Sequence, residues 1–183
     1  MQYMSREKPV ILVGIVSPSH FYFPHPYIIS LLTMMTYCYS KKVVEGINFS
    51  FQNGPKTATN RNRVLEKAQG KCHYVLFIDT DMTFEMDTIE KLVATAEANP
   101  GSVVTGIGCI GQPPFRPAIF TCEFEEGERP QHIEVWPDEP FEVGACGSFC
   151  MLIPMPIIDK LGVKCFTHIN DYYGSEVDHE DRE

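Results

Sequence analysis

One segment constrains the fold of this chain more than any other: residues 73–82 read His-Tyr-Val-Leu-Phe-Ile-Asp-Thr-Asp-Met. The apolar run is continuous and rich in β-branched and aromatic residues, so it predicts a strand that is buried on both faces. Such strands belong to parallel sheets covered by helices, and ligands of these sheets bind outside the carboxyl ends of the strands. Asp79 and Asp81 are therefore expected where a ligand binds.

The two acids are separated by one residue. Because side chains alternate along an extended chain, the two carboxylates are expected to point the same way and to share one ligand or one cation. Ligand sets made only of oxygen suit Mg²⁺ or Mn²⁺. The same pair also fits a strand that ends in a turn with two solvated acids, so the rest of the chain has to decide.

Composition favours a single globular domain without a nucleic-acid partner. A chain of 183 residues, 44% of them hydrophobic, has enough interior to bury a sheet on both faces. The net charge of −9 argues against non-specific nucleic-acid binding, which needs clusters of Lys and Arg. The 7 cysteines form no CxxC pair and no compact framework, and we interpret them as reduced thiols of a cytoplasmic protein.

Neither a signal peptide nor a transmembrane segment is expected. Residues 1–9 are polar and charged and run directly into an apolar strand, without the apolar region of a signal peptide. The longest apolar stretch, residues 27–38, is too short to cross a bilayer. We interpret this stretch as a buried helix.

Strand and helix signals alternate along the first part of the chain. Besides the strand that ends at Asp79, strands are predicted over residues 10–16, 43–49 and 102–107. Helices are predicted over residues 25–38 and 57–69, and a third begins at Asp87, with Glu90 completing a capping box, and stops at residues 99–101. This order predicts an open α/β sheet.

The second half has a different character. Residues 108–117 are rich in Gly and Pro, short strands are expected at 119–124 and 133–136, and glycines interrupt the apolar stretch 141–153. We therefore expect one domain over residues 1–183. Its nucleotide-binding half covers about residues 9–107, and a smaller, mixed-sheet acceptor half covers about residues 108–183.

Five segments in this order resemble a GT-A glycosyltransferase of the family 2 type. They are Ile-Val-Ser-Pro at 15–18, Thr-Asn-Arg-Asn-Arg at 59–63, Phe-Ile-Asp-Thr-Asp-Met at 77–82, the glycine-containing block 144–153, and His-Glu-Asp at 179–181. The resemblance covers about residues 9–183. It implies a Rossmann-like, mostly parallel sheet flanked by helices, and the transfer of a sugar from a nucleotide-diphosphate donor to the hydroxyl of a glycan, lipid or protein acceptor.

The resemblance also implies roles on the donor side. Asp81 would be the direct ligand of Mn²⁺ or Mg²⁺, and Asp79 would hold the ribose or assist the metal through water. Arg61 lies on the apolar face of its predicted helix, so it either pairs with an acid inside or reaches the crevice to hold phosphate or base. The base pocket would be formed by Ser17, Pro18 and Ser19.

On the acceptor side, the resemblance assigns the catalytic base of an inverting reaction to Asp181, with Glu180 bracing the acceptor. Glu176 offers a competing frame for the same acidic motif. Gly147, followed by Ser148, would let an acceptor approach the backbone, or would mark a bulge. Family members usually continue beyond the acidic motif, so we expect either a truncated chain or a minimal catalytic domain.

Two alternatives differ from sugar transfer. Residues 77–83 also fit the motif of haloacid-dehalogenase phosphatases, in which Asp79 would be a phosphorylated nucleophile and Asp81 an acid/base. That motif normally stands near the start of the chain, whereas two β-α units precede it here, and neither Lys160 nor Lys164 stands in the context the family needs. The other alternative is a module that binds a sugar nucleotide without turnover.

A few further residues have two interpretations each. Trp136 either stacks on a sugar ring or belongs to the core. The histidines His20, His25 and His179 are either metal ligands or structural, and His179, beside the acids, is the best candidate of the three for a ligand.

Overall fold

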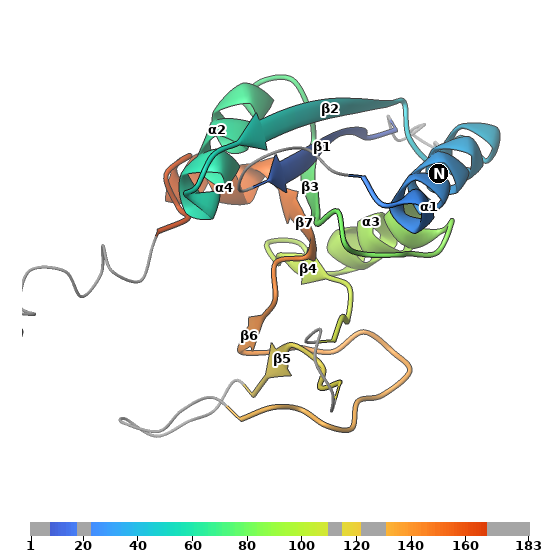
Figure 1. The fold of residues 1–183 in the computed structure, drawn as a ribbon, viewed down its shortest axis with the longest axis vertical. Coiled ribbons are helices and arrows are strands. Elements are labelled where there is room, and N and C mark those ends of the chain that lie inside the picture. The colour runs from blue at the N-terminus through green and yellow to red at the C-terminus, as the bar shows by residue number, and fades with distance from the viewer. Residues whose placement is uncertain (1–7, 18–22, 110–114, 122–130, 168–183) are drawn as a thin grey trace, which may run out of the picture.

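The computed structural model describes residues 8–17, 23–109, 115–121 and 131–167. A five-stranded sheet forms its centre (Figure 1). In spatial order the strands are β2 (Gly46–Asn53), β1 (Val10–Ser17), β3 (Tyr74–Ile78), β7 (Cys150–Pro154) and β4 (Val104–Thr105). The first three strands are parallel to one another, and β7 runs antiparallel to both of its neighbours.

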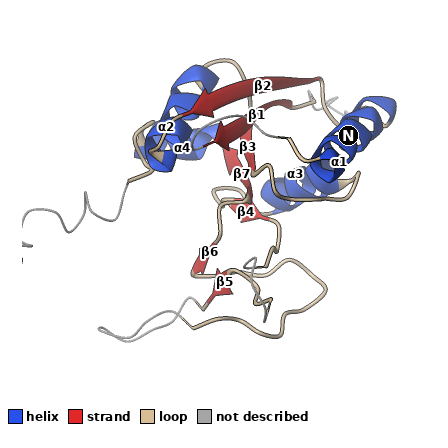
Figure 2. Ribbon diagram, in the orientation of Figure 1, coloured by secondary structure: helices blue, strands red, loops and turns tan. Residues whose placement is uncertain are grey.

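Helices cover both faces of this sheet (Figure 2). On one face lie α1 (His25–Ser40) and α3 (Thr88–Ala98), and on the other lie α2 (Thr57–Ala68) and α4 (Met155–Leu161). Because side chains alternate along a strand, the sheet contributes to both layers of the core: Leu76 packs toward α1 and α3, whereas Phe77 packs toward α2 and α4. The fold class expected from the sequence, an α/β sheet flanked by helices, is confirmed.

The third helix shows where local patterning predicts well and where it does not. Its buried residues, Ile89, Leu92, Val93 and Ala96, recur at the three- and four-residue spacing of one helix face, as the apolar pattern of this segment predicts. The predicted capping box is wrong, because the Asp87 side chain makes no capping hydrogen bond. Asp87 instead pairs with Lys91 at 3.0 Å, and Glu90 accepts a hydrogen bond of 2.6 Å from the Tyr37 hydroxyl of α1.

Three strand predictions need correction. The strand expected at 43–49 is β2, which begins at Gly46, because the backbone N–H of Val43 bonds to Cys38 and Lys42 has a φ of 55°, so these residues close α1. The strand expected at 102–107 is reduced to β4. Residues 133–136 form no strand, and Val135 is 88% exposed.

The insertion of β7 between β3 and β4 shapes the site. Because β7 is antiparallel to β3, its first residue lies beside the last residue of β3: Ile78 pairs with Cys150. The pairing continues one step further, since the backbone N–H of Asp79 donates to the carbonyl of Phe149 at 2.9 Å. The glycine-containing block before β7 is thereby brought to the carboxyl end of β3.

A second, two-stranded sheet lies beside the end of the main sheet (Figure 1). It pairs β5 (Ile119–Phe120) with β6 (Ala145–Cys146) in antiparallel fashion. Within the described part of the chain, no helix is long and apolar enough to span a membrane. The six described cysteines are free thiols.

Candidate functional site

The two acids that follow β3 lie in a tight turn. The backbone N–H of Met82 donates to the carbonyl of Asp79 at 3.3 Å, three residues back. The reason given above for grouping the two carboxylates, alternation along an extended strand, is therefore wrong, since β3 ends at Ile78. Asp81 is nevertheless close enough for its charge to raise the pKa of Asp79.

Arg61 of α2 reaches this turn. Its Nη2 lies 3.5 Å from Oδ1 of Asp79 and 3.5 Å from the carbonyl oxygen of Ser148. Of the two possibilities foreseen for Arg61, pairing with an acid is therefore observed, and the pair sits at the carboxyl end of β3. The Arg61 side chain is only 13% exposed, against 39% for Asp79, so the guanidinium forms the inner wall and the carboxylate faces outward.

Electrostatics leave this carboxylate incompletely compensated. Burial raises the pKa of Asp79, the Arg61 guanidinium lowers it, and the negative charge of Asp81 raises it again, so that the net shift is upward. An acid whose charged form is disfavoured in this way attracts a further cation. At this turn, the buried positive charge of Arg61 therefore lies beside two carboxylates that repel each other.

These carboxylates fit a hard divalent cation shared with a ligand. Among the described residues, no group of three or more His, Cys, Asp or Glu side chains could hold a metal by itself. Mg²⁺ does not need such a group, because it keeps several waters and is commonly bound through one or two carboxylates plus the phosphates of a substrate. Asp81, which is exposed, is the carboxylate free to face the solvent side.

Two neighbouring aromatic rings, which we call the arginine cage, pack against the Arg61 guanidinium. Its Cζ lies 5.8 Å from the centroid of Phe77, in β3, and 5.7 Å from that of Phe166, in the segment after α4. These are the distances of cation–π contacts. The Nε–H of Arg61 is buried and has no hydrogen-bond partner in the described part of the chain, so packing, more than hydrogen bonding, holds this side chain.

Asn60 is a structural residue that the sequence analysis did not single out. It is 1% exposed, and its Nδ2 donates to the carbonyl of Gly54 at 2.9 Å. The N–H of Gly54 in turn donates to the carbonyl of Ser17, at 3.1 Å. Asn60 thus fastens the loop after β2 to α2, while the backbone of Gly54 fastens the same loop to the end of β1. A polar residue at a buried helical position was the available signal.

The remaining predicted residues are placed as follows. Ser17 is the last residue of β1 and is 7% exposed. At Gly147, a Cβ would overlap the ring of Phe149, so packing within the chain is what requires a glycine here. Arg63 is exposed, and Trp136, at 41% exposed, is not a core residue. His25 is exposed at the start of α1. Outside the described residues lie Pro18, Ser19, His20, Glu176, His179, Glu180 and Asp181.

Tyr27 of α1 is a further buried polar group related to this site. Its side chain is 1% exposed, and its hydroxyl has no hydrogen-bond partner among the described residues. Burial, and secondly the negative charge of Asp79, raise the pKa of Tyr27 to about 12. The ring stacks against Phe23 and meets the edge of Phe84, which follows the acidic turn.

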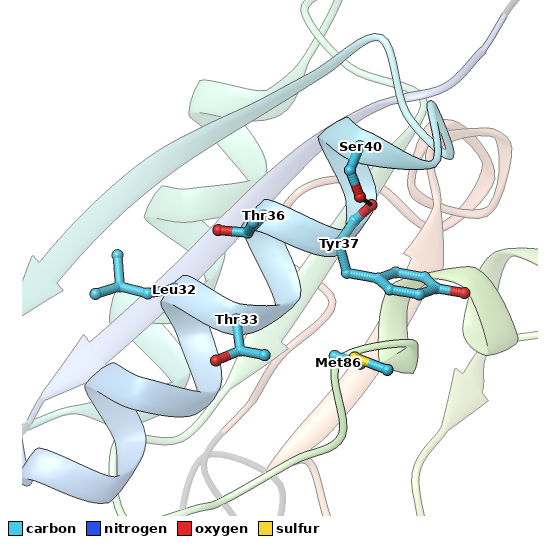
Figure 3. Close-up of a pocket in the computed structure, with 6 residues that line it drawn as sticks. All are labelled: Leu32, Thr33, Thr36, Tyr37, Ser40 and Met86. Carbon is cyan, nitrogen blue, oxygen red and sulfur yellow. Dashed lines mark hydrogen bonds between the residues drawn. The ribbon is translucent and has the colours of Figure 1, made fainter.

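A hollow on the outer face of α1 contains none of the predicted site residues (Figure 3). Met86, from the loop before α3, forms one wall, and no charged side chain takes part. The α1 residues in its lining are Leu32, Thr33, Thr36, Tyr37 and Ser40. Because it lacks acids and cations, this hollow does not match the chemistry expected at the end of β3.

Comparison with known protein families gives a match that covers most of the described sheet. The family described as glycosyl transferase family 2 matches residues 41–162, which run from the end of α1 to the end of α4. Arg61, Asp79, Asp81 and Gly147 lie inside the matched segment, whereas Ser17 and Asp181 lie outside it. A search of curated proteins finds no match.

Proposed function

This chain belongs to glycosyl transferase family 2, and we propose that it transfers a sugar from a nucleotide-diphosphate donor with the help of Mn²⁺ or Mg²⁺ held at Asp81. The observation that carries the proposal is the acidic turn after β3, where two mutually repelling carboxylates stand beside a caged arginine. That arrangement suits a ligand that brings both a cation and phosphates. The donor diphosphate is such a ligand.

The chemistry explains why these residue types are needed. Negative charge grows on the diphosphate as the sugar leaves, and a divalent cation supplies the charge that stabilises it. In our proposal Asp81 is the direct ligand, and Asp79, held from behind by Arg61, binds the ribose or a metal-bound water. Arg61 holds phosphate or base. Ser17, Pro18 and Ser19 form the pocket for the base, and Gly147 lies where the acceptor approaches the backbone.

For the acceptor, we assign proton removal to Asp181 and bracing of the acceptor to Glu180, in an inverting reaction. A hydroxyl needs a carboxylate to take its proton as the new bond forms. Both acids lie outside the described residues, and family resemblance is what supports their roles.

The free thiols favour a reducing compartment, and we propose that the protein acts in the cytoplasm.

The test is thermal unfolding with MnCl₂ and UDP, GDP, CDP or ADP, each alone and with the metal. We expect one nucleotide with Mn²⁺ to raise the Tm by more than the two separate effects combined, because a ligand of the native state stabilises it by mass action. Asp81→Asn should keep the unliganded Tm and lose this cooperative effect. Asp159→Asn removes an exposed acid of α4 and serves as the matched control.

Binding of the nucleotide by Asp81→Asn without metal, at the affinity of the wild type, would contradict the assignment. The phosphatase alternative has no support from the comparisons, and we do not propose it. A binding module without turnover is separated from a transferase by incubating the matching nucleotide sugar with enzyme and Mn²⁺ and measuring release of the nucleoside diphosphate. Asp81→Asn controls for contaminating hydrolases.

A further inference from the structure

Asn62 makes two hydrogen bonds to one residue far along the chain. Its Nδ2 donates to the carbonyl of Phe166 at 2.8 Å, and its Oδ1 accepts from the N–H of Phe166 at 3.0 Å. A primary amide is suited to this, because it carries a donor and an acceptor side by side, as a backbone peptide does. The contact fastens the segment after α4 to α2 across 104 residues.

The fastened residue is one wall of the arginine cage. The Phe166 ring meets the Phe77 ring at 5.6 Å and 84°, and both rings lie within 6 Å of the Arg61 guanidinium. The hydrogen bonds of Arg61 are long, at 3.5 Å each, and therefore weak. Its orientation toward Asp79 thus depends on two aromatic walls, and Asn62 holds one of them in place.

The order of residues in α2 explains how one short segment serves three purposes. Successive residues of a helix are rotated by about 100°, so neighbours in sequence face different partners. Asn60 faces the loop at Gly54, Arg61 faces the acidic turn, and Asn62 faces Phe166. Each polar side chain of this run has a separate contact in the structure.

We propose that Asn62 and Phe166 are positioning residues that hold Arg61 against Asp79, and so keep the donor site in its binding geometry. The part of this inference that concerns the donor rests on the proposed function. The cage itself, with its effect on Arg61, is independent of any ligand. The competing explanation is that the Asn62 contact merely stabilises the fold.

The first measurement needs no ligand. Phenylglyoxal labels exposed arginines, and Arg63, which is exposed and two residues away, provides an internal reference. In the wild type we expect Arg61 to react more slowly than Arg63. Asn62→Ala and Phe166→Leu should each raise the Arg61 rate about tenfold, because the cage opens, and leave the Arg63 rate unchanged. Phe166→Tyr keeps the aromatic wall and should behave like the wild type.

The second measurement is the affinity for a nucleotide, determined by calorimetry in a double-mutant cycle. The ligand is the nucleoside diphosphate that, together with Mn²⁺, stabilises the protein most in the thermal-unfolding test. Asn62→Ala should weaken binding about three- to tenfold in the wild-type background and less than about twofold in Arg61→Ala, since the two residues act through one contact. Equal weakening in both backgrounds, or a lower Tm with Arg61 labelling unchanged, would overturn the inference. Altered labelling without any nucleotide binding would instead keep the cage and remove the proposed function.

Discussion

At the scale of single residues, the Tyr27 hydroxyl lowers the stability of the unliganded protein. This hydroxyl is buried and bonds to none of the residues that the structure describes, and such a group costs about 1–3 kcal/mol of folding free energy. The hydroxyl also lies in the field of Asp79, which contributes to the raised pKa of Tyr27. A phenylalanine would fill the same space between Phe23 and Phe84 without that cost.

We therefore expect Tyr27→Phe to raise the free energy of unfolding of the unliganded protein by about 1 kcal/mol, measured by urea denaturation. Tyr37→Phe is the control, because the Tyr37 hydroxyl donates to Glu90 at 2.6 Å and its loss should not stabilise. A lower stability of Tyr27→Phe would mean that water or another group satisfies the hydroxyl. Weaker nucleotide binding by a more stable Tyr27→Phe would give the hydroxyl a role toward the ligand.

Single residues of the site also differ in how well the sequence predicts their contacts. The position of Arg61 on an apolar helix face left two possibilities, pairing with an acid inside or reaching the crevice, because arginine is rarely buried unpaired. Its partner Asp79 followed from the end of a buried strand. The role of Asn62 could not be predicted, since it depends on a contact with Phe166 that no local pattern encodes.

At the scale of elements, the connections around β7 meet at one aromatic ring. Phe149 is wedged between Gly108, after β4, and Gly147, after β6, and a Cβ at either glycine would overlap its ring. Ala118 links the same two glycines, donating from its N–H to Gly108 and accepting from Gly147, both at 2.8 Å. The Phe149 carbonyl accepts from Asp79, so this wedge bears directly on the acidic turn.

Gly147→Ala should lower the free energy of unfolding by about 1–3 kcal/mol, because the ring cannot move toward Gly108 to make room. Chemical denaturation measures this. Gly46→Ala is the matched control, since a Cβ there would meet nothing within 4 Å. Adding Phe149→Leu to Gly147→Ala should recover part of the loss. A Gly147→Ala protein as stable as the wild type would show that the wedge does not constrain the connection.

Helices and strands were predicted correctly where a local sequence pattern defines them, and missed where pairing between distant strands defines them. The stripe of α3 follows from helical spacing alone. Val43 and Val44 looked like the start of a strand because they are β-branched and apolar, yet they belong to the turn that follows α1. The place of β7 was not predictable either, because an apolar run reads the same whether its neighbours are parallel or antiparallel.

At the scale of the whole molecule, the residues that we propose for the donor and for the acceptor lie in different parts of the chain. Arg61, Asp79 and Asp81 lie within the segment 41–162 that matches the family, and all three belong to the described residues. The proposed base, Asp181, lies beyond both. If the assignment is right, donor binding and transfer should therefore respond to different variants.

Asp181→Asn should leave binding of Mn²⁺ and nucleotide near the wild-type affinity, because the base meets the acceptor hydroxyl and not the donor. Transfer should fall by about two to four orders of magnitude, the usual effect of removing a positioned proton acceptor. The measurement is turnover with a matching donor and acceptor pair, and Glu176→Gln tests the competing frame of the acidic motif. Wild-type turnover by Asp181→Asn, or a product that retains the anomeric configuration of the donor, would exclude Asp181 as the base. A loss of donor binding along with turnover would show that the end of the chain also builds the donor site, and the separation argued from the family match would not hold.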